Sequence, residues 1–259
     1  MDLELHGKVA VVSAATRGIG FETALSLARE GARVALFARD PAGLGEAARR
    51  IARATNVQPF VQQADLRDAD SIASFFQTVR NELGPVQVLV ANSVGPRPGG
   101  FEHFDDADWL AALDGALLST VRLARAAIPQ MLESGAGSMV AIQSASVKQP
   151  IQGLTLSNGV RPGVAGLMKS LAAEYGERGL RFNVVCPGRI MTDRFIAVES
   201  SYGIPLEERL AAQAAEIPLR RLGTPREVAD AITFLSSARA AYITGSVLAV
   251  DGGNIRGIF

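Results

Sequence analysis

The sequence predicts a single α/β domain, residues 1–259, in which helices cover both faces of a doubly wound, mostly parallel sheet. Short apolar runs alternate with longer segments of helical periodicity, and this alternation is typical of strand–helix–strand crossovers. The apolar runs are almost continuous, as in strands that are buried on both faces. No repeat and no segment rich in Pro, Ser and Gly marks a domain boundary.

The apolar runs and the helical segments give the expected order of elements. Strands are expected at 8–13, 33–37, 86–91, 138–142, 182–186 and 247–250, with a shorter candidate at 57–61. Helices are expected at 19–30, 41–54, 69–83, 109–133, 164–178 and 225–236. Glycines follow four of these helices, where a left-handed C-cap is favoured: Gly31, Gly84, Gly135 and Gly179.

Composition narrows the class of protein. The 26 basic and 26 acidic side chains give a net charge of zero, which argues against nucleic acid or an anionic membrane as a partner. The single cysteine, Cys186, excludes an internal disulfide, and His6 and His103 do not have the spacing of metal ligands, so we predict no metal site. No apolar stretch reaches the roughly 18 residues of a membrane helix. No signal peptide is visible, so we expect a soluble, cytoplasmic protein that acts on a small molecule.

The first ligand-binding segment is expected at 13–20, Ser-Ala-Ala-Thr-Arg-Gly-Ile-Gly, between a strand and a helix. Ligands of such sheets bind outside the carboxyl ends of the strands. Gly18 and Gly20 let the backbone approach a diphosphate, whose charge the free N–H groups of the helix N-terminus stabilise. The segment therefore predicts a cofactor loop, with an ordinary strand-to-helix turn as the alternative.

Charged residues near this loop indicate which nicotinamide cofactor it takes. Arg17 lies in the loop and Arg39 ends the second strand, and guanidinium groups pair with the 2′-phosphate of NADP(H). Alternatively, Arg39 forms a surface ion pair with Asp40. Asp65, after the third strand, either accepts a hydrogen bond from the adenine amino group or begins a helix as its N-cap. The polar stretch 193–222 is expected to form a helical substrate lid.

Several segments taken together resemble the short-chain dehydrogenase/reductase family, and the resemblance spans nearly the whole chain. They are 13–20, 64–65, 89–95, 142–144, 181–188 and 243–253. The segments REGARVALFARD and GSVLAVDGG look like the 3-oxoacyl carrier-protein reductase branch of the family. The resemblance implies a Rossmann-type fold, nicotinamide binding and a homotetramer or homodimer. The cofactor contacts that it implies are Ser13, Thr16, Arg17, Gly18, Ile19, Gly20, Arg39, Asp65, Leu66, Asn92, Arg161, Pro187, Gly188, Ile190 and Thr192.

Two cofactor motifs depart from the family pattern. Ser13-Ala14 stands where the family has Thr-Gly, and an alanine is tolerated there if its φ is negative. The segment 91–94, Ala-Asn-Ser-Val, stands where the family has Asn-Asn-Ala-Gly. We expect both changes to alter details of cofactor placement and to leave the loop intact.

The catalytic positions depart further. The family uses Asn, Ser, Tyr and Lys, with Ser thirteen residues before Tyr and Lys four residues after it. Ser144 matches the serine, so the same spacing places Ser157 and Arg161 at the Tyr and Lys positions. Ala116, seven residues after Trp109, takes the place of Asn. The resemblance therefore assigns an atypical active site to Ser144, Ser157 and Arg161.

The substituted residues change the proton chemistry. A phenol has a pKa near 10, whereas an aliphatic hydroxyl resembles water, near 15.7, and the gap amounts to roughly 8 kcal/mol if fully expressed. Arg161 is expected to hold ribose hydroxyls and supply positive charge, but a guanidinium stays protonated near neutrality, which would exclude proton exchange. Tyr202 in the lid is either the replacement acid or, as the favoured alternative, a surface residue. Tyr175 matches a structural position of the family, and Tyr242 lies in the C-terminal interface region. Lys148 either overlooks the site or is solvated.

Three functions follow. The first is an NADP-dependent oxidoreductase that acts on a carbonyl or alcohol substrate by a tyrosine-independent proton path. The second is a catalytically impaired NADP-binding protein, a sensor or partner subunit. A third is an enzyme that uses the fold for another step, such as elimination. Arg161 favours functions that bind the cofactor. It replaces the family's Lys by another cation, and this exchange preserves the contact with the ribose.

Overall fold

A seven-stranded, wholly parallel sheet forms the centre of the computed structural model, which describes residues 1–200 and 203–258. The strand order is β3-β2-β1-β4-β5-β6-β7, so it reverses between β1 and β4, where ligands of doubly wound sheets bind. This confirms the predicted fold class. The strands are β1 (Val9–Ser13), β2 (Arg33–Ala38), β3 (Phe60–Gln63), β4 (Val88–Ala91), β5 (Gly137–Ile142), β6 (Leu180–Pro187) and β7 (Val247–Val250).

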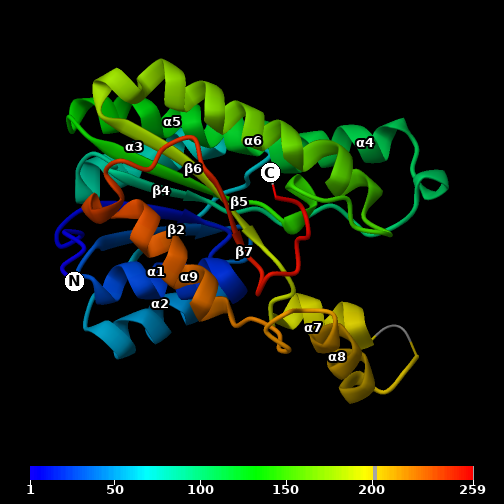
Figure 1. The fold of residues 1–259 in the computed structure, drawn as a ribbon. Helices are drawn as coiled ribbons and strands as arrows, with labels where there is room; N and C mark the ends of the chain where they lie inside the picture. The colour runs from blue at the N-terminus through cyan, green and yellow to red at the C-terminus, as the bar shows by residue number, and fades with distance from the viewer. Residues whose placement is uncertain (201–202, 259) are drawn as a thin grey trace.

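Helices cover both faces of the sheet (Figure 1). One face carries α1 (Gly18–Arg29), α2 (Pro41–Thr55) and α9 (Pro225–Ser236). The other carries α3 (Ala69–Leu83), α5 (Ser119–Glu133) and α6 (Thr155–Tyr175). Each face has its own apolar core, so the central strands are buried on both sides, as their continuous apolar sequences require.

Two expected helices differ from the observed ones. The segment 109–133 is divided into α4 (Asp106–Leu113), a π-helical turn (Asp114–Leu118) and α5. The helix expected at 164–178 begins nine residues earlier, at Thr155, and contains Pro162. Burial of its first turns against the rest of the fold outweighs the backbone hydrogen bond that proline removes.

The third strand also lies later than the candidate at 57–61. Asn56 ends α2 in the left-handed conformation, and pairing with β2 begins only at Phe60. The four glycines expected at helix ends, Gly31, Gly84, Gly135 and Gly179, all have positive φ angles.

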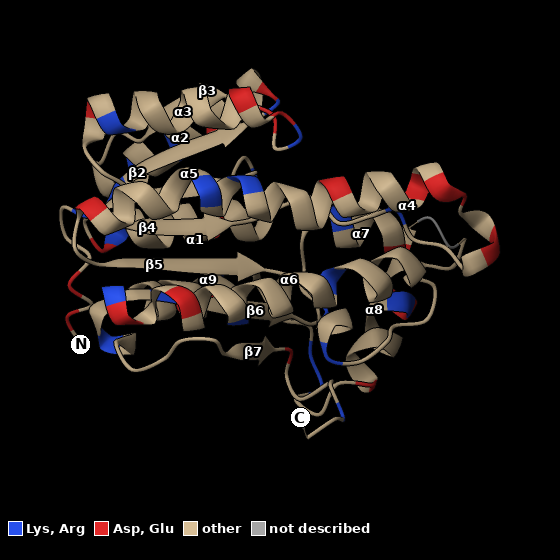
Figure 2. Cartoon of the chain, turned by 90° about the horizontal axis from the view of Figure 1, so that it is seen from above, with Lys and Arg blue, Asp and Glu red and all other residues tan. Residues whose placement is uncertain are grey.

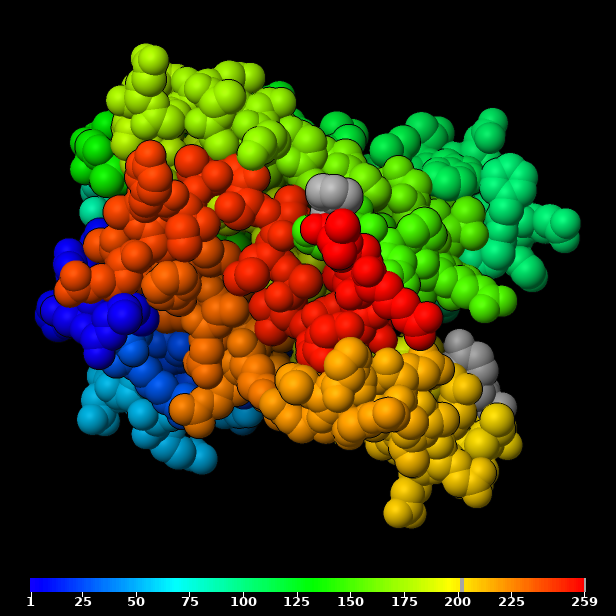
Figure 3. Space-filling model, viewed as in Figure 1, coloured from blue at the N-terminus to red at the C-terminus, as the bar shows by residue number. Residues whose placement is uncertain are grey.

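The segment expected to form a lid contains α7 (Asp193–Ser200) and α8 (Leu206–Ala215). Both helices lie beyond the carboxyl ends of the strands (Figures 1 and 2). The C-terminal segment lies against them and against the main body of the domain (Figure 3). There Leu219 N–H donates to the carbonyl of Gly252, and Arg256 N–H donates to Gln149 Oε1. Within residues 1–200 and 203–258, no helix is both long and apolar enough to cross a membrane.

Candidate active site

The glycine-rich loop brings four of the predicted cofactor residues together. Gly18 has a φ of +59°, and a Cβ there would lie 3.5 Å from Cγ2 of Thr192. A Cβ on Gly20 would lie 2.6 Å from Nδ2 of Asn92 and 2.8 Å from the carbonyl oxygen of Ala14. Only glycine fits at position 20, because the ends of β1 and β4 approach each other there.

The N-terminus of α1 suits an anion. Arg17 is its N-cap residue, and no side chain caps the helix in the described structure. The first turn also contains no acidic residue. Its N–H groups are therefore available to the diphosphate of a nucleotide cofactor, and this loop fits such a group.

Ser13 and Asn92 tie the ends of β1 and β4 together. The Ser13 hydroxyl donates to the carbonyl of Asn92 (2.7 Å) and accepts from its N–H (2.9 Å). The Asn92 amide donates to the carbonyl of Ala14 (3.1 Å). Ala14 has a φ of +49°, so the condition under which an alanine is readily tolerated there is not met. The left-handed conformation costs an alanine roughly 1 kcal/mol, and the hydrogen bond from Asn92 helps to hold it.

Arg17 and Arg39 are both exposed, and neither forms an ion pair with a described residue. Asp40 caps α2 instead, by accepting from the N–H of Ala42 (3.1 Å), so the alternative of an ion pair between Arg39 and Asp40 is wrong. A Cβ on Gly43 would contact both Asp40 and Thr16, which places the glycine-rich loop beside the end of β2.

Asp65 and Leu66 follow β3. The Asp65 carboxylate accepts from the N–H of Arg67 (3.0 Å), whereas α3 is capped by Asp68, which accepts from the N–H groups of Asp70 and Ser71. Asp65 is therefore not the N-cap, and that alternative is wrong. Leu66 is half-buried and packs against the core.

The loop after β6 carries the other predicted cofactor contacts. Gly188 lies so close to Asp251 that a Cβ there would be 2.6 Å from its side chain. Ile190 is buried and pairs with Gly223 in an isolated bridge. Thr192 accepts through Oγ1 from the N–H of Phe195. The loop from Pro187 onwards is thus held in place by the segments before α9 and after β7.

The three predicted catalytic residues meet at the end of β5. Ser144 caps a short 3-10 turn by accepting from the N–H of Ser146 (3.2 Å). Ser157 and Arg161 lie one helical turn apart on α6, and each is only 6% exposed. The hydroxyl oxygens of Ser157 and Ser146 are 3.0 Å apart and share a hydrogen bond.

Arg161 is a buried cation. Its Nη1 donates to Gln143 Oε1 (3.0 Å), and its buried Nε has no hydrogen-bond partner among the described residues. Burial, together with the nearby charge of Arg194, lowers the pKa of Arg161 to about 10. Arg161 nevertheless stays protonated near neutrality, so it is still excluded as a proton donor.

Cys186 lies in the same neighbourhood, at the end of β6. Burial is the main reason that the pKa of its thiol is raised to about 11, and the charges of Lys148 and Arg161 oppose this rise. The thiol is therefore neutral and unsuited to nucleophilic attack. The half-buried Lys148 is close enough to the site for its charge to act there.

Ala116, which stands at the position of the family's Asn, and the tyrosines Tyr175 and Tyr242 contribute no acid to the candidate site. Ala116 is buried in the π-helical turn, and its carbonyl accepts from the Thr120 hydroxyl (2.8 Å). Tyr175 packs against Phe182, whereas Tyr242 is fully exposed, so neither belongs to the site. Tyr202 lies outside the described residues.

Sequence reasoning missed three residues of this site: Gln143, Ser146 and Arg194. Gln143 and Ser146 are within two residues of Ser144, so their place beside a strand-end serine was a usable signal. Arg194 carries no such signal, because only the tertiary fold brings the start of α7 to the loop after β4, where its guanidinium donates to the carbonyls of Gly95 and Pro96.

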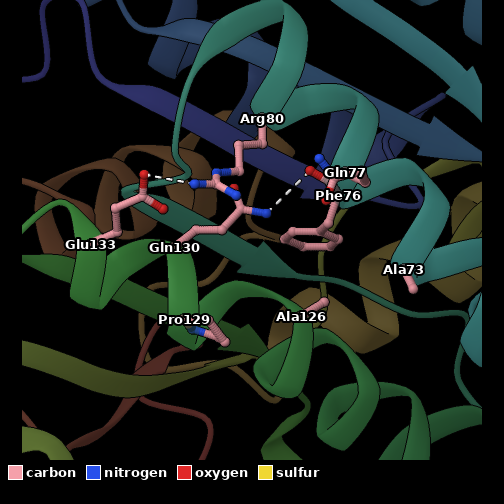
Figure 4. Close-up of a pocket in the computed structure, with 8 residues that line it drawn as sticks. All are labelled: Ala73, Phe76, Gln77, Arg80, Ala126, Pro129, Gln130 and Glu133. Carbon is pink, nitrogen blue, oxygen red and sulfur yellow. Dashed lines mark hydrogen bonds and ion pairs between the residues drawn. The ribbon is translucent and has the colours of Figure 1, made fainter.

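Two surface hollows lie outside this cluster. One, of about 700 Å³, is lined mainly by aliphatic side chains of α8 and by Met191, in the loop that leads to Thr192. The other, of about 280 Å³, lies between α3 and α5 (Figure 4). There Arg80 pairs with Glu133 (2.9 Å), and Gln130 donates to the carbonyl of Phe76 (3.1 Å). Of the two hollows, only the one beside Met191 borders a loop with predicted cofactor contacts.

A family model described as Enoyl-(Acyl carrier protein) reductase matches residues 13–254. The 3-oxoacyl-(acyl-carrier-protein) reductase FabG of Vibrio harveyi is 32% identical over 258 residues, covering 97% of this chain and 98% of the relative. The chain belongs to the short-chain dehydrogenase/reductase family. It is therefore an oxidoreductase, and its sequence lies close to the FabG-like branch.

Solved structures of short-chain dehydrogenases/reductases agree with this assignment. L-sorbose reductase from Gluconobacter frateurii, solved with NADPH and L-sorbose, has a TM-score of 0.95 and 30% identity, with both chains fully covered. A short-chain oxidoreductase from Pseudomonas aeruginosa, described as containing an atypical catalytic center, has a TM-score of 0.93 and 30% identity. That match covers 99% of this chain and all of the other.

Proposed function

We propose that the protein is an NADP(H)-dependent oxidoreductase that interconverts a carbonyl and an alcohol without a tyrosine acid. The observation that carries this proposal is the buried guanidinium of Arg161, which lies one helical turn from Ser157 and is held by Gln143. The glycine-rich loop and the uncapped N-terminus of α1 fit the diphosphate of the cofactor. The solved sorbose reductase, which binds NADPH, supports the choice of cofactor.

Each proposed residue has a chemical role. The nicotinamide, when bound, supplies or accepts the hydride. Arg161 holds ribose hydroxyls and stabilises the negative charge that develops on the carbonyl oxygen as the hydride arrives. Ser144 donates a hydrogen bond to that oxygen. The proton comes from solvent water by way of the linked hydroxyls of Ser157 and Ser146, since an aliphatic hydroxyl alone is a poor acid.

The second candidate is an NADP-binding sensor or partner subunit with little catalytic power. The Ser157 hydroxyl bonded to Ser146 and the methyl group of Ala116 favour it, because neither replaces the family's acid or its asparagine. Oxidation of NADPH with a panel of ketones, diketones and acyl thioesters separates the two functions. Tight NADPH binding without oxidation would support the sensor and exclude the reductase.

We expect NADPH to bind at least tenfold more tightly than NADH, a difference of about 1.4 kcal/mol. Arg17 and Arg39 are exposed and unpaired within the described structure, so both remain free for a 2′-phosphate. Fluorescence titration of the wild type and of Arg39→Ala measures the preference, which the variant should lose. Arg33→Ala, at the other end of β2, is the control. Equal affinities in the wild type would contradict the prediction.

We also expect a homodimer or homotetramer. Tyr242, Leu248 and Ile258 are exposed apolar side chains, and Leu248 lies on β7, one of the two edge strands of the sheet. Association would cover both the apolar side chains and the strand edge. Light scattering at micromolar concentration should give a multiple of 27.2 kDa, and Leu248→Lys should lower it. A monomer mass for the wild type would refute the expectation.

Two other roles are proposals. Residues 193–222 would serve as the substrate lid, because their helices lie beyond the strand ends and border the hollow beside Met191. A cytoplasmic location stays a prediction from the sequence.

A further inference from the structure

Two guanidinium groups approach each other beside the proposed catalytic residues. A Cβ on Gly95 would lie 2.8 Å from Nη2 of Arg161 and 3.7 Å from Nη2 of Arg194. The two Nη2 atoms are therefore no farther apart than the sum of these distances. Gly95 leaves this space open, because any larger residue would push into the Arg161 guanidinium.

Neither cation has an anionic partner within the described residues. Arg161 donates to the neutral amide of Gln143, and its Nε is buried without a hydrogen-bond partner. Arg194 donates to the carbonyls of Gly95 and Pro96. Burial and, second to it, the charge of Arg194 lower the pKa of Arg161. Arg161 is buried, whereas Arg194 is exposed, so an anion between the two groups would compensate the buried charge of Arg161 and relieve the repulsion between the two cations.

The cofactor has other binding groups for its own anions. The N-terminus of α1 is available to its diphosphate, and Arg17 and Arg39 to a 2′-phosphate. Arg161, the buried member of the pair, lies instead one helical turn from Ser157, whose hydroxyl is bonded to Ser146, where the substrate reacts in the proposed function. A guanidinium has five N–H donors, and Arg161 uses Nη1 for Gln143, so donors remain for a ribose hydroxyl and an anion together.

We propose that Arg161 and Arg194 bind the carboxylate of the substrate, which is an oxo acid. Arg161 lies one helical turn from Ser157 on α6, so the two residues share one face of the helix. In the proposed complex of a short 2-oxo or 3-oxo acid, the carboxylate lies between the guanidinium groups and the ketone oxygen lies near Ser144. This inference rests on the proposed function. Hydride adds to the ketone carbon and a proton to its oxygen, so a hydroxy acid forms and the carboxylate is unchanged.

Matched pairs of substrates test the carboxylate directly. NADPH oxidation is measured with 2-oxobutanoate and 3-oxobutanoate and with their methyl esters, and calorimetry measures binding of the same compounds to the protein saturated with NADP⁺. We expect at least one acid to bind tenfold or more tightly than its ester. Arg194→Gln should remove this preference by weakening acid binding at least tenfold, with unchanged affinity for the ester and for NADPH. Arg194→Lys, which keeps the positive charge, should retain most of the preference for the acid over its ester.

Arg226→Gln is the matched control, because it removes one exposed guanidinium that pairs only loosely with Asp230 (3.9 Å). Equal binding of acids and esters, or acid binding that survives Arg194→Gln, would overturn the inference and leave the proposed function standing. Weaker NADPH binding by the Arg194→Gln variant would mean that Arg194 binds the cofactor, and this result would also overturn the inference. Failure of the proposed function gives a different result: none of the carbonyl compounds would support NADPH oxidation by the wild type, whether or not the protein bound the acids.

Discussion

Replacing Ser157 by Tyr and Arg161 by Lys together is expected to raise NADPH-dependent reduction of a neutral 1,2-diketone at least a hundredfold. A phenol with a pKa near 10 is a far better acid than an aliphatic hydroxyl, and a positioned general acid contributes typically 10²–10⁴-fold. The lysine ammonium would lower the phenol's pKa further. The diketone is neutral, so its rate does not depend on the proposed carboxylate contacts.

Ser157→Tyr alone should restore much less activity. The Arg161 guanidinium is fixed by Gln143 and stays planar, so it cannot reproduce the compact ammonium of a lysine beside the phenol. Ala116 remains a limit in both variants, and adding Ala116→Asn should raise the rate of the double variant again. Steady-state rates of wild type, single, double and triple variants give the comparison, with circular dichroism to check folding.

A wild type as fast as an ordinary family member would show that the proton-transfer argument is wrong. So would a double variant that is folded and binds NADPH but is no faster than the wild type. The first result would mean that Ser157 and its partner Ser146 already deliver the proton efficiently, and the second that proton transfer does not limit the rate.

Local sequence predicts best those elements whose ends carry their own signals. The bounds of α3, α9 and β7 agree with the predicted ranges. Asp68 caps α3, and Thr224 forms a capping box with Glu227 at the start of α9. In such segments, side chains within four residues satisfy the backbone, so no distant contact is needed to fix the boundary.

The start of α6 could not be predicted in this way. Gly159, Pro162 and Gly163 all disfavour a helix, and their presence argues for a later start. In the fold, the ring of Trp109 packs so close to Gly159 that a Cβ there would lie 2.7 Å from it. The glycine is thus a packing requirement between α4 and α6, and tertiary contact outweighs local propensity.

In the candidate site, too, some residues could be predicted from local sequence, whereas others are brought together only by the tertiary fold. Motif spacing placed Ser144, Ser157 and Arg161 in one neighbourhood, because strand ends and helical turns have fixed geometry. The proximity of Arg194 to Arg161 and the left-handed Ala14 depend on loops from distant parts of the chain. No local pattern encodes such contacts, so the anion-binding pair became visible only in the structure.

Gly20→Ala is expected to lower the affinity for NADPH more than tenfold and to lower Tm. The added Cβ would lie 2.6 Å from Nδ2 of Asn92 and 2.8 Å from the carbonyl oxygen of Ala14. The carbonyl of Ala14 belongs to the backbone and cannot rotate away as the end of a flexible side chain can. The loop and the first turn of α1 must therefore move apart. That movement displaces the N–H groups proposed to hold the diphosphate and breaks the bond between Asn92 and Ala14.

Gly45→Ala in α2 is the matched control, because its Cβ would meet only the guanidinium of Arg49 at 3.6 Å, an ordinary contact. Alanine favours a helix over glycine by roughly 0.5–1 kcal/mol, so this variant should unfold at the same or a higher Tm and bind NADPH normally. Thermal unfolding and fluorescence titration of both variants separate the crowding at Gly20 from a general effect of adding a methyl group. Unchanged NADPH affinity in a folded Gly20→Ala protein would place the diphosphate elsewhere than on this loop.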